Sequence, residues 1–272
     1  MQIVSKKQTV IRPPVKWHGG KYYLAKRIIS YFPKHSIYLE PFGGAASVLL
    51  NKYPAEVESY NDLNLKISRL FRVLQKDGQE FIKKLQFIPY SQYEFDMAAS
   101  YPEKASDLEK SVCDYIRWRQ SFGGQGRSWS YTTKRARGGR AGDVNAWWTA
   151  IDQLPYIIER LKDVQILHQP AIKAIERFDD SEALIYCDPP YLHETRSLNG
   201  RDIYEKEMST EEHTELADVL NKCKSKVIIS GYPSKLYSKL YNSWKKIQFD
   251  IANHSAGGKT KERKTETLWL NW

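Results

Sequence analysis

ALIYCDPPY, residues 183–191, joins an apolar run to a rigid turn. The run Ala183–Cys187 predicts a short buried strand. In Asp188–Tyr191, each proline fixes its own φ and lacks an N–H, so the carbonyl oxygens of the turn have few local partners. Together with the Asp188 carboxylate and the flat Tyr191 ring, they suit a planar ring that bears an amino group, such as adenine or cytosine. Taken alone, the same residues also fit a plain strand and proline turn with Tyr191 in the core.

Short β-like runs alternate with helical patterns on both sides of this stretch. Such alternation predicts a doubly wound α/β fold with a mostly parallel sheet, whose ligand crevice lies outside the carboxyl ends of the strands. Glu40, Asp62 and Asp188 end or follow predicted strands and are therefore expected at that edge. We expect strands at Ser36–Glu40, Val57–Asn61, Val164–Leu167, Ala183–Cys187 and Val227–Ser230, and an antiparallel pair at Ile247–Ile251 and Thr267–Asn271. We expect helices at Tyr22–Tyr31, Ala45–Asn51 and Leu63–Gln75.

Residues 79–156 break this alternation. Helical segments at Phe81–Leu85, Asp107–Arg119 and Val144–Leu154 surround a centre rich in Gly and Arg, which indicates an inserted helical lobe with a loop or hairpin. The centre contains seven basic residues and no acidic one, interleaved with aromatic residues. This composition suits nucleic-acid binding, and a solvated basic loop is the alternative. The seven are Arg117, Arg119, Arg127, Lys134, Arg135, Arg137 and Arg140.

The 272 residues carry a net charge of +10, with a sequence pI near 9.3, and include eight tryptophans and eighteen tyrosines. A basic chain rich in stacking surfaces favours a nucleic acid as partner over a membrane surface, because no amphipathic Lys-rich helix stands out. No apolar run approaches the roughly 18 residues of a membrane span. The polar stretch Met1–Arg12 does not resemble a secretory signal. Cys113, Cys187 and Cys223 lack CxxC spacing and are expected to be reduced thiols of a cytosolic protein, without zinc or disulfides.

Two glycine-containing motifs lie near the N-terminus. Trp17–Lys21 (WHGGK) precedes a predicted helix and offers close backbone approach and free N–H donors. It is not a phosphate-binding P-loop, because Val15 and Tyr22 replace the required Gly and Ser or Thr. Glu40–Gly44 (EPFGG) ends the first strand with a carboxylate and a turn that admits a ligand, although it is not a GxGxxG fingerprint. Asp62 is placed either to accept ribose hydroxyls or to cap the following helix.

In order and spacing, Lys16–Lys21, Glu40–Gly44 and Asp188–Tyr191 resemble the motifs of Dam-like, alpha-group, site-specific DNA N6-adenine methyltransferases. The resemblance runs from about Pro13 to Trp272 and implies a Rossmann-like seven-stranded, mostly parallel sheet. Residues 1–78 and 157–272 would form the S-adenosylmethionine-binding catalytic domain, and residues 79–156 the helical target-recognition insertion. The implied cofactor-binding residues are Trp17, Lys21, Glu40, Phe42, Gly43, Asp62 and Asp188, and the implied catalytic residues are Asp188, Pro189, Pro190 and Tyr191.

The resemblance also implies a reaction. A methyl group passes from S-adenosylmethionine to N6 of an adenine flipped out of double-stranded DNA, which leaves S-adenosylhomocysteine. Asp188 and the carbonyl of Pro189 or Pro190 would accept hydrogen bonds from the two N6 protons, while Tyr191 stacks on the ring, so no metal is needed. The alternatives are N4 of cytosine, an RNA or a protein glutamine amide as substrate, and a catalytically silent nucleic-acid-binding protein with the same fold.

Some positions depart from the family pattern. His18 stands where a small residue is common, Gly44–Ala46 replace a more glycine-rich run, and Pro170 stands where many relatives place an acid near the cofactor adenine. Gln120–Gly124 does not match the corresponding motif of GATC-specific members, so no recognition sequence is inferred. We expect a monomer, with a dimer as the alternative, in the cytoplasm and on the nucleoid of a bacterial or phage-infected cell. An orphan enzyme and a restriction-modification partner are both compatible with these residues.

Overall fold

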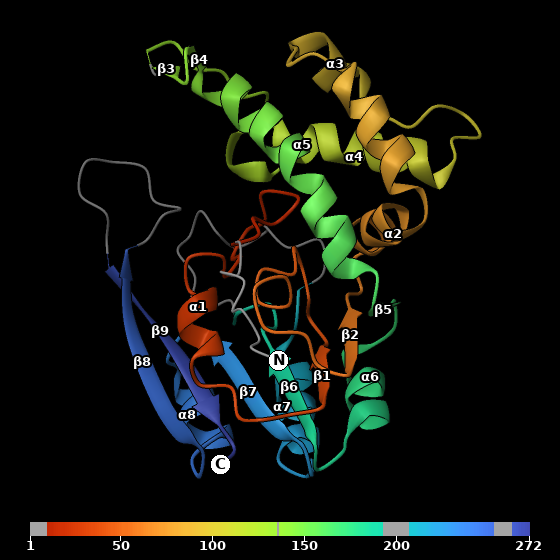
Figure 1. The fold of residues 1–272 in the computed structure, drawn as a ribbon. Coiled ribbons are helices and arrows are strands. Elements are labelled where there is room, and N and C mark those ends of the chain that lie inside the picture. The colour runs from red at the N-terminus through yellow and green to blue at the C-terminus, as the bar shows by residue number, and fades with distance from the viewer. Residues whose placement is uncertain (1–9, 135, 193–206, 253–262) are drawn as a thin grey trace, which may run out of the picture.

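The structure is a computed structural model that describes residues 10–134, 136–192, 207–252 and 263–272. Its main sheet is built from β1 (Ile37–Glu40), β2 (Val57–Asn61), β5 (Val164–Leu167), β6 (Ala183–Cys187), β7 (Lys226–Gly231), β8 (Lys245–Ala252) and β9 (Arg263–Leu270). The order across the sheet is β5-β2-β1-β6-β7-β9-β8 (Figure 1). The strands from β5 to β7 are parallel, whereas β9 pairs antiparallel with both β7 and β8.

The predicted seven-stranded, mostly parallel sheet is therefore confirmed. Each predicted strand overlaps an observed one, and Val57–Asn61, Val164–Leu167 and Ala183–Cys187 match β2, β5 and β6 residue for residue. The predicted C-terminal antiparallel pair also forms, with Lys245 opposite Leu270. The parallel strands place their carboxyl ends at one edge of the sheet, where the candidate site lies.

Helices cover both faces of the sheet, because the central strand β6 is apolar and buried on both sides. Leu184 and Tyr186 belong to one core cluster, which α1, α2 and α5 share, whereas Ile185 and Cys187 belong to the cluster of α6, α7 and α8. The helices are α1 (Ala25–Ile29), α2 (Leu65–Gln86), α3 (Gln92–Met97), α4 (Asp107–Arg119), α5 (Gly142–Leu161), α6 (Ala171–Phe178), α7 (Thr210–Leu220) and α8 (Lys235–Leu240).

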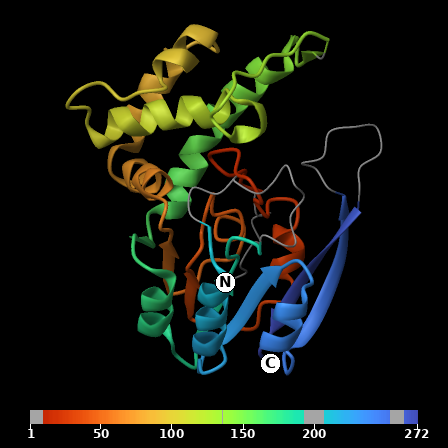
Figure 2. The same ribbon diagram turned by 180° about the vertical axis from the view of Figure 1, so that it is seen from behind.

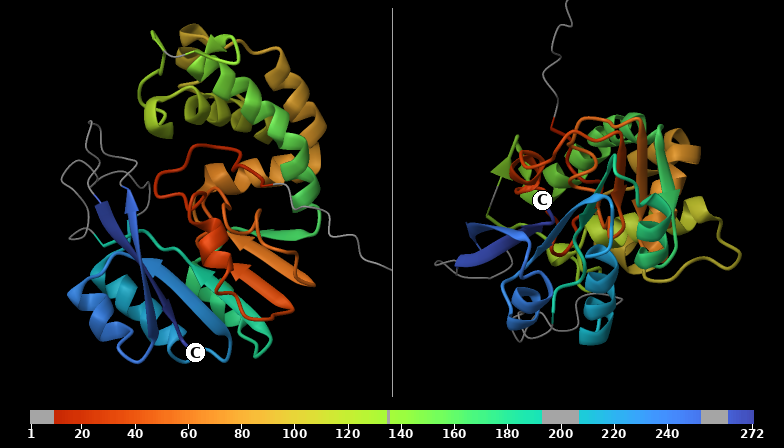
Figure 3. Two further views of the ribbon diagram at one scale, coloured as in Figure 1. Left: turned by 60° about the vertical axis from the view of Figure 1, so that its left-hand side comes forward. Right: turned by 90° about the horizontal axis from the view of Figure 1, so that it is seen from below.

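Two long helices, α2 and α5, carry an inserted lobe beyond the carboxyl edge of the sheet (Figures 2 and 3). The lobe also contains α3, α4, a 3-10 turn at Phe122–Gly124 and a hairpin of β3 (Ala136–Arg137) and β4 (Arg140–Ala141). Gly138 and Gly139 turn this hairpin with positive φ angles of 57° and 74°. The predicted domain limits after residues 78 and 156 fall inside α2 and α5, beside a non-helical residue at Asp77 and a proline at Pro155.

A buried ion-pair cluster fixes the lower end of α5 to the sheet. Arg160 Nη1 lies 2.5 Å from Oε2 of Glu58 in β2, and Lys52 Nζ lies 2.5 Å from Oε1. Arg160 also donates to the Leu49 carbonyl at 2.9 Å. Because all three charged groups are almost completely buried, removing Glu58 would leave two buried basic groups without compensation. The lobe is thus anchored where α5 meets β2, the strand that Asp62 follows.

One predicted helix is wrong. Ala45–Asn51 forms a series of turns, because Gly44 and Ala46 have positive φ angles of 47° and 55°, which a right-handed helix does not accommodate. The helix predicted at Tyr22–Tyr31 is shorter, and the one predicted at Leu63–Gln75 continues to Gln86. Within the described ranges, the helices are too short or too polar to cross a membrane. The same ranges hold no cluster of three His, Cys, Asp or Glu side chains arranged for a metal ion.

Candidate active site

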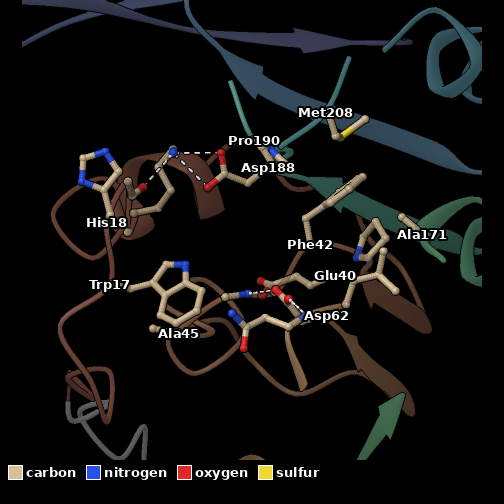
Figure 4. A pocket seen from close by; sticks show the side chains of 18 of the residues that line it. Trp17, His18, Glu40, Phe42, Ala45, Asp62, Ala171, Asp188, Pro190 and Met208 are labelled. Carbon is tan, nitrogen blue, oxygen red and sulfur yellow. Dashed lines mark hydrogen bonds and ion pairs between the residues drawn. The ribbon is translucent and has the colours of Figure 1, made fainter. Parts of the chain in front are cut away.

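A cavity of about 720 Å³ lies at the carboxyl edge of the sheet (Figure 4). Glu40 at the end of β1, Asp62 after β2 and Asp188 after β6 all line it. In Figure 4, Trp17 lies at one end of this space and Ala171 at the other. The cavity brings together eight predicted site residues: Trp17, Lys21, Glu40, Phe42, Gly43, Asp62, Asp188 and Pro190. Pro189 and Tyr191 are buried beside it and do not line it.

Donors from two distant parts of the chain hold the Asp188 carboxylate. Lys21 Nζ lies 2.8 Å from Oδ1 and 2.9 Å from Oδ2. Ser230 Oγ, near the end of β7, donates to Oδ1 at 2.7 Å, and the Tyr191 hydroxyl lies 3.3 Å from the same oxygen. The side chain of Asp188 keeps 19% of its surface exposed. The carboxylate is therefore fixed in orientation and still open to a donor from a ligand.

The Tyr191 hydroxyl is directed at Glu266 of β9, to which it donates a hydrogen bond. The Tyr191 ring packs edge to face on Tyr232 at 4.7 Å between centroids, and Lys21 Nζ lies 4.8 Å from the Tyr191 ring centroid. Burial and the nearby carboxylates of Asp188 and Glu266 raise the pKa of Tyr191 well above its usual value. The hydroxyl therefore stays protonated and acts as a donor.

Glu40 is a buried carboxyl in the wall of the cavity, with 2% of its surface exposed. Tyr38 OH donates to its Oε1 at 2.6 Å. Burial raises the pKa of Glu40 to about 8; the Tyr38 hydrogen bond and Lys52 lower it, and Asp188 raises it. Such a carboxyl is mostly protonated at neutral pH, and a positively charged ligand group would favour its ionised form.

Asp62 ties the end of β2 to the turn that follows β1. Its Oδ2 accepts from the Gly44 N–H and its Oδ1 from the Asn64 N–H, both at 2.8 Å. The cap of α2 is Asn64, whose side chain accepts from two N–H groups of the first turn. The alternative in which Asp62 caps this helix is therefore wrong, and its role toward a ribose stays a prediction.

Aromatic packing requires the two glycines of the first turn. A Cβ atom at Gly43 would lie 2.1 Å from the Tyr60 ring. At Gly44, where φ is +47°, a Cβ atom would lie 2.6 Å from Trp17 Nε1. These glycines let Tyr60 and Trp17 approach the backbone at the edge of the cavity, so the turn is shaped by close packing as well as by any ligand.

The inserted lobe meets the N-terminal motif at the edge of the cavity. Lys16 Nζ donates to the Ser121 carbonyl at 3.2 Å, and Trp17 packs edge to face on Trp118 at 6.0 Å. A Cβ at Gly124 would lie 2.5 Å from the Lys16 carbonyl oxygen. Burial and, to a smaller extent, nearby Arg119 lower the pKa of Lys16 to about 8. The two parts of the chain are therefore in close contact where they border the site.

Among the residues whose contacts are described above, Lys16, Trp118, Ser230 and Glu266 were not predicted as site residues. Lys16 precedes a recognised motif, and Ser230 ends a predicted strand, so the rule that ligands bind at carboxyl strand ends applies to it. Trp118 and Glu266 carry no such local signal, because their partners lie far away in the sequence.

The predicted DNA-binding residues occupy two kinds of position. Arg117 donates to the Phe95 and Gly126 carbonyls, and Arg119 donates to the Ala146 carbonyl at 2.9 Å, so both make contacts inside the lobe. Arg127 lines the cavity. It is exposed, and so are three basic residues around the hairpin: Lys134, Arg137 and Arg140. Arg135 lies outside the described residues. The DNA-binding role of the whole set stays a prediction.

The sheet order, the cavity at its carboxyl edge and the DPPY carboxylate facing that cavity define a Rossmann-like methyltransferase. The family model for the D12 class N6 adenine-specific DNA methyltransferases matches residues 17–256, and the chain belongs to this family. It is a site-specific adenine methyltransferase of DNA. The predicted family and the predicted site-specific methylation of adenine in DNA are thereby confirmed.

Curated relatives match over most of their length. The DNA adenine methylase of Haemophilus influenzae is 26% identical over 260 residues, which cover 89% of this chain and 88% of that protein. The DNA adenine methylase of Escherichia coli K12 is 24% identical over 272 residues, 94% of each chain. The type II methyltransferase M.MjaIII of Methanocaldococcus jannaschii is 24% identical over 297 residues, which cover 96% of this chain and 99% of that protein.

Proposed function

We propose that the protein transfers a methyl group from S-adenosylmethionine, bound in the cavity, to N6 of an adenine flipped out of double-stranded DNA. When bound, this cofactor supplies an electrophilic methyl group on a positively charged sulfur. One observation carries the proposal: a single cavity is lined both by the Asp188 carboxylate and by the buried carboxyl of Glu40. The first suits an amino group of a base, and the second suits the cationic end of an amino acid.

The residues present fit this cofactor in size and in chemistry. A cavity of about 720 Å³ is within the usual range of small-molecule sites. Glu40 would hold the cofactor's amino group, Asp62 its ribose hydroxyls, and Phe42 would pack against its base. Pro170 offers no side-chain acceptor where relatives place an acid, although Glu212 of α7 lines the same cavity.

The N6 amine of adenine is a poor nucleophile, because its lone pair is delocalised into the ring. In the proposed arrangement, Asp188 accepts a hydrogen bond from one N6 hydrogen and the carbonyl of Pro189 or Pro190 accepts one from the other, which localises the lone pair on the nitrogen. The nitrogen attacks the methyl group as the sulfur–carbon bond breaks, and the resulting cationic nitrogen then loses one proton to Asp188 or to water. Lys21 and Ser230 already hold the Asp188 carboxylate, so little reorganisation is needed when the amine arrives.

An adenine inside a duplex cannot reach this cavity, so the base must leave the stack at a cost of a few kcal/mol. Phe122 and Tyr131 of the lobe are 74% and 68% exposed and are available to stack on opened DNA, at about 1–3 kcal/mol per base. Exposed Arg127, Arg137 and Arg140 would bind phosphates or base edges. Residues 79–156 would then act as the target-recognition domain, and residues 1–78 and 157–272 as the catalytic domain.

One target adenine needs one such site, so we propose that a monomer is the working unit, acting where the DNA is, on the nucleoid in the cytoplasm. Light scattering with and without DNA tests the stoichiometry. Sequencing of methylated bases in DNA from expressing cells would give the recognition site. The presence or absence of a nuclease activity against the unmethylated site in the source cells would separate a restriction-modification partner from an orphan enzyme.

The central experiment is Asp188→Ala. This variant should lose methyl transfer from labelled S-adenosylmethionine and keep nearly normal DNA affinity, because the acceptor is lost and the lobe is untouched. Asp163→Ala removes an exposed carboxylate outside the cavity and serves as the control. Near-wild-type transfer by the Asp188 variant would refute the assignment, and failure of the wild type to bind S-adenosylhomocysteine would refute the cofactor.

A further inference from the structure

Glu266 is a buried carboxylate that belongs to none of the sequence motifs. It lies in β9 opposite Phe249 of β8 and is 2% exposed. Its Oε1 accepts a hydrogen bond from the hydroxyl of Tyr191, the last residue of the DPPY turn. The same oxygen lies 3.9 Å from Lys21 Nζ. Glu266 therefore contacts two of the residues that surround the Asp188 carboxylate.

The Tyr191 hydroxyl lies between two carboxylates and has a single proton to donate. Its contact with Glu266 is the shorter one, since Asp188 Oδ1 is 3.3 Å away. Asp188 already accepts from Lys21 and Ser230. A further donor on Asp188 would compete with the N6 amine for the remaining lone pairs. By accepting the hydrogen bond of the Tyr191 hydroxyl, Glu266 keeps this hydroxyl from donating to Asp188.

We propose that Glu266 is a positioning residue of the methyl-transfer centre: by accepting the Tyr191 hydroxyl, it fixes the tyrosine ring and keeps Asp188 available to the target amine. The inference rests on the proposed function of Asp188 and Tyr191. Glu266 takes no part in making or breaking bonds. It affects the reaction only through its hydrogen bond with Tyr191.

Charge compensation alone does not explain this carboxylate. At Glu58, two basic side chains bind one buried carboxylate, which is the arrangement of a structural ion pair. Around Lys21 the ratio is reversed: in the described part of the chain, one ammonium lies within 4 Å of both Asp188 and Glu266. Surplus buried negative charge is unfavourable for folding. Its presence beside the DPPY turn therefore points to a role in the site.

Protonation of Glu266 should impair this role. Burial raises the pKa of Glu266, whereas Lys21 lowers it and Asp188 raises it. The charged or titratable groups that face it are Lys21, Asp188, Tyr186, Tyr191 and Tyr232. A protonated Glu266 is a poorer acceptor for the hydroxyl. The wild-type rate should therefore fall as the pH falls through the raised pKa of Glu266.

The test measures single-turnover methyl transfer on a duplex carrying the site identified by sequencing. Glu266→Leu removes the acceptor and should slow transfer at least about tenfold, the effect of one lost hydrogen bond to a charged group. Tyr191→Phe loses the hydrogen bond that fixes the ring but also removes the competing donor, so it should slow transfer no more than Glu266→Leu does, and the double variant should be no slower than Glu266→Leu alone. Glu266→Gln keeps an acceptor oxygen that does not titrate, so it should restore most of the rate at neutral pH and move the acid limb to lower pH.

Glu58→Gln is the matched control, because it changes an equally buried carboxylate outside the site. It should lower Tm without moving the acid limb.

Equal rates for Glu266→Leu and the wild type, or additive effects of Glu266→Leu and Tyr191→Phe, would overturn the proposal. Where Glu266→Leu does not fold, an acid limb left unchanged by Glu266→Gln would overturn it. A wild-type protein that binds S-adenosylhomocysteine but does not methylate the duplex would instead contradict the proposed function.

Discussion

Glu40→Gln should uncouple cofactor binding from proton release. In the ligand-free protein, burial raises the pKa of Glu40 to about 8. A group with this pKa is about nine-tenths protonated at pH 7. A ligand ammonium beside it would hold the carboxylate ionised, so binding must expel the proton. The glutamine variant has no proton to lose.

The assay is isothermal titration calorimetry of S-adenosylhomocysteine at pH 7, repeated in buffers of different ionisation enthalpy. The wild type should release about 0.9 proton per ligand bound. Its affinity should rise with pH from 6 to about 7.5, below the point where a free α-amino group, of pKa about 7.7–8.0, begins to lose its own charge. Glu40→Gln should bind more weakly, with proton release near zero and a flat pH dependence over this range.

Stability offers an independent measurement of the same group. A carboxyl whose pKa is raised by folding binds more protons in the folded state, so the ligand-free protein should lose stability as the pH rises from about 4.5 to about 8. In Glu40→Gln this contribution disappears. No proton release by the wild type, or the same release by the variant, would refute the placement of Glu40 against the ligand's cationic end.

Packing, surface charge and a buried ion pair each give a further expected outcome. Gly44→Ala should abolish S-adenosylhomocysteine binding in calorimetry, because its Cβ would lie 2.6 Å from the indole nitrogen of Trp17. Gly139→Ala, also at positive φ but in open space, should bind normally, and equal binding by both variants would contradict this prediction. Arg137→Ala should lower the slope of log DNA affinity against log salt by about 1 in fluorescence anisotropy, and an unchanged slope would place this side chain off the DNA. Asp114→Ala should cost about 3–5 kcal/mol in urea unfolding, because the buried Arg69 loses its carboxylate; a cost below about 1 kcal/mol would show that the pair is not needed.

The sheet could be predicted because its signals are local. Short apolar runs such as Ala183–Cys187 need no knowledge of their partners, and the alternation with helices follows from the same residues. Ala45–Asn51 shows where local signals fail. Its composition suits a helix, but the positive φ angles of Gly44 and Ala46 fit the packing of Trp17 and Tyr60 around the turn, which only the folded chain reveals.

The candidate site divides in the same way. Glu40, Asp62 and Asp188 follow from the rule that ligands bind at carboxyl strand ends. Glu266 could not be predicted by this rule, because its partner Tyr191 lies 75 residues earlier and no sequence pattern near Glu266 indicates the contact. Composition also cannot tell where a basic side chain points: Arg119 bonds a carbonyl inside the lobe, whereas Arg137 of the same basic stretch is exposed.

The inserted lobe and the carboxyl edge of the sheet differ in charge. The chain is basic overall, and its exposed hairpin is suited to a polyanion. At the carboxyl edge of the sheet, Glu40, Asp188 and Glu266 are buried or nearly so, and among the described residues Lys21 is the cation that contacts Asp188 directly. Burial raises the pKa of both Glu40 and Glu266, so a positively charged ligand group beside them would favour their ionised forms. A site in this condition favours a positively charged ligand over a neutral one of the same shape. In the proposed function, the lobe would attract the negatively charged DNA backbone, and the cavity would attract the cationic methyl donor.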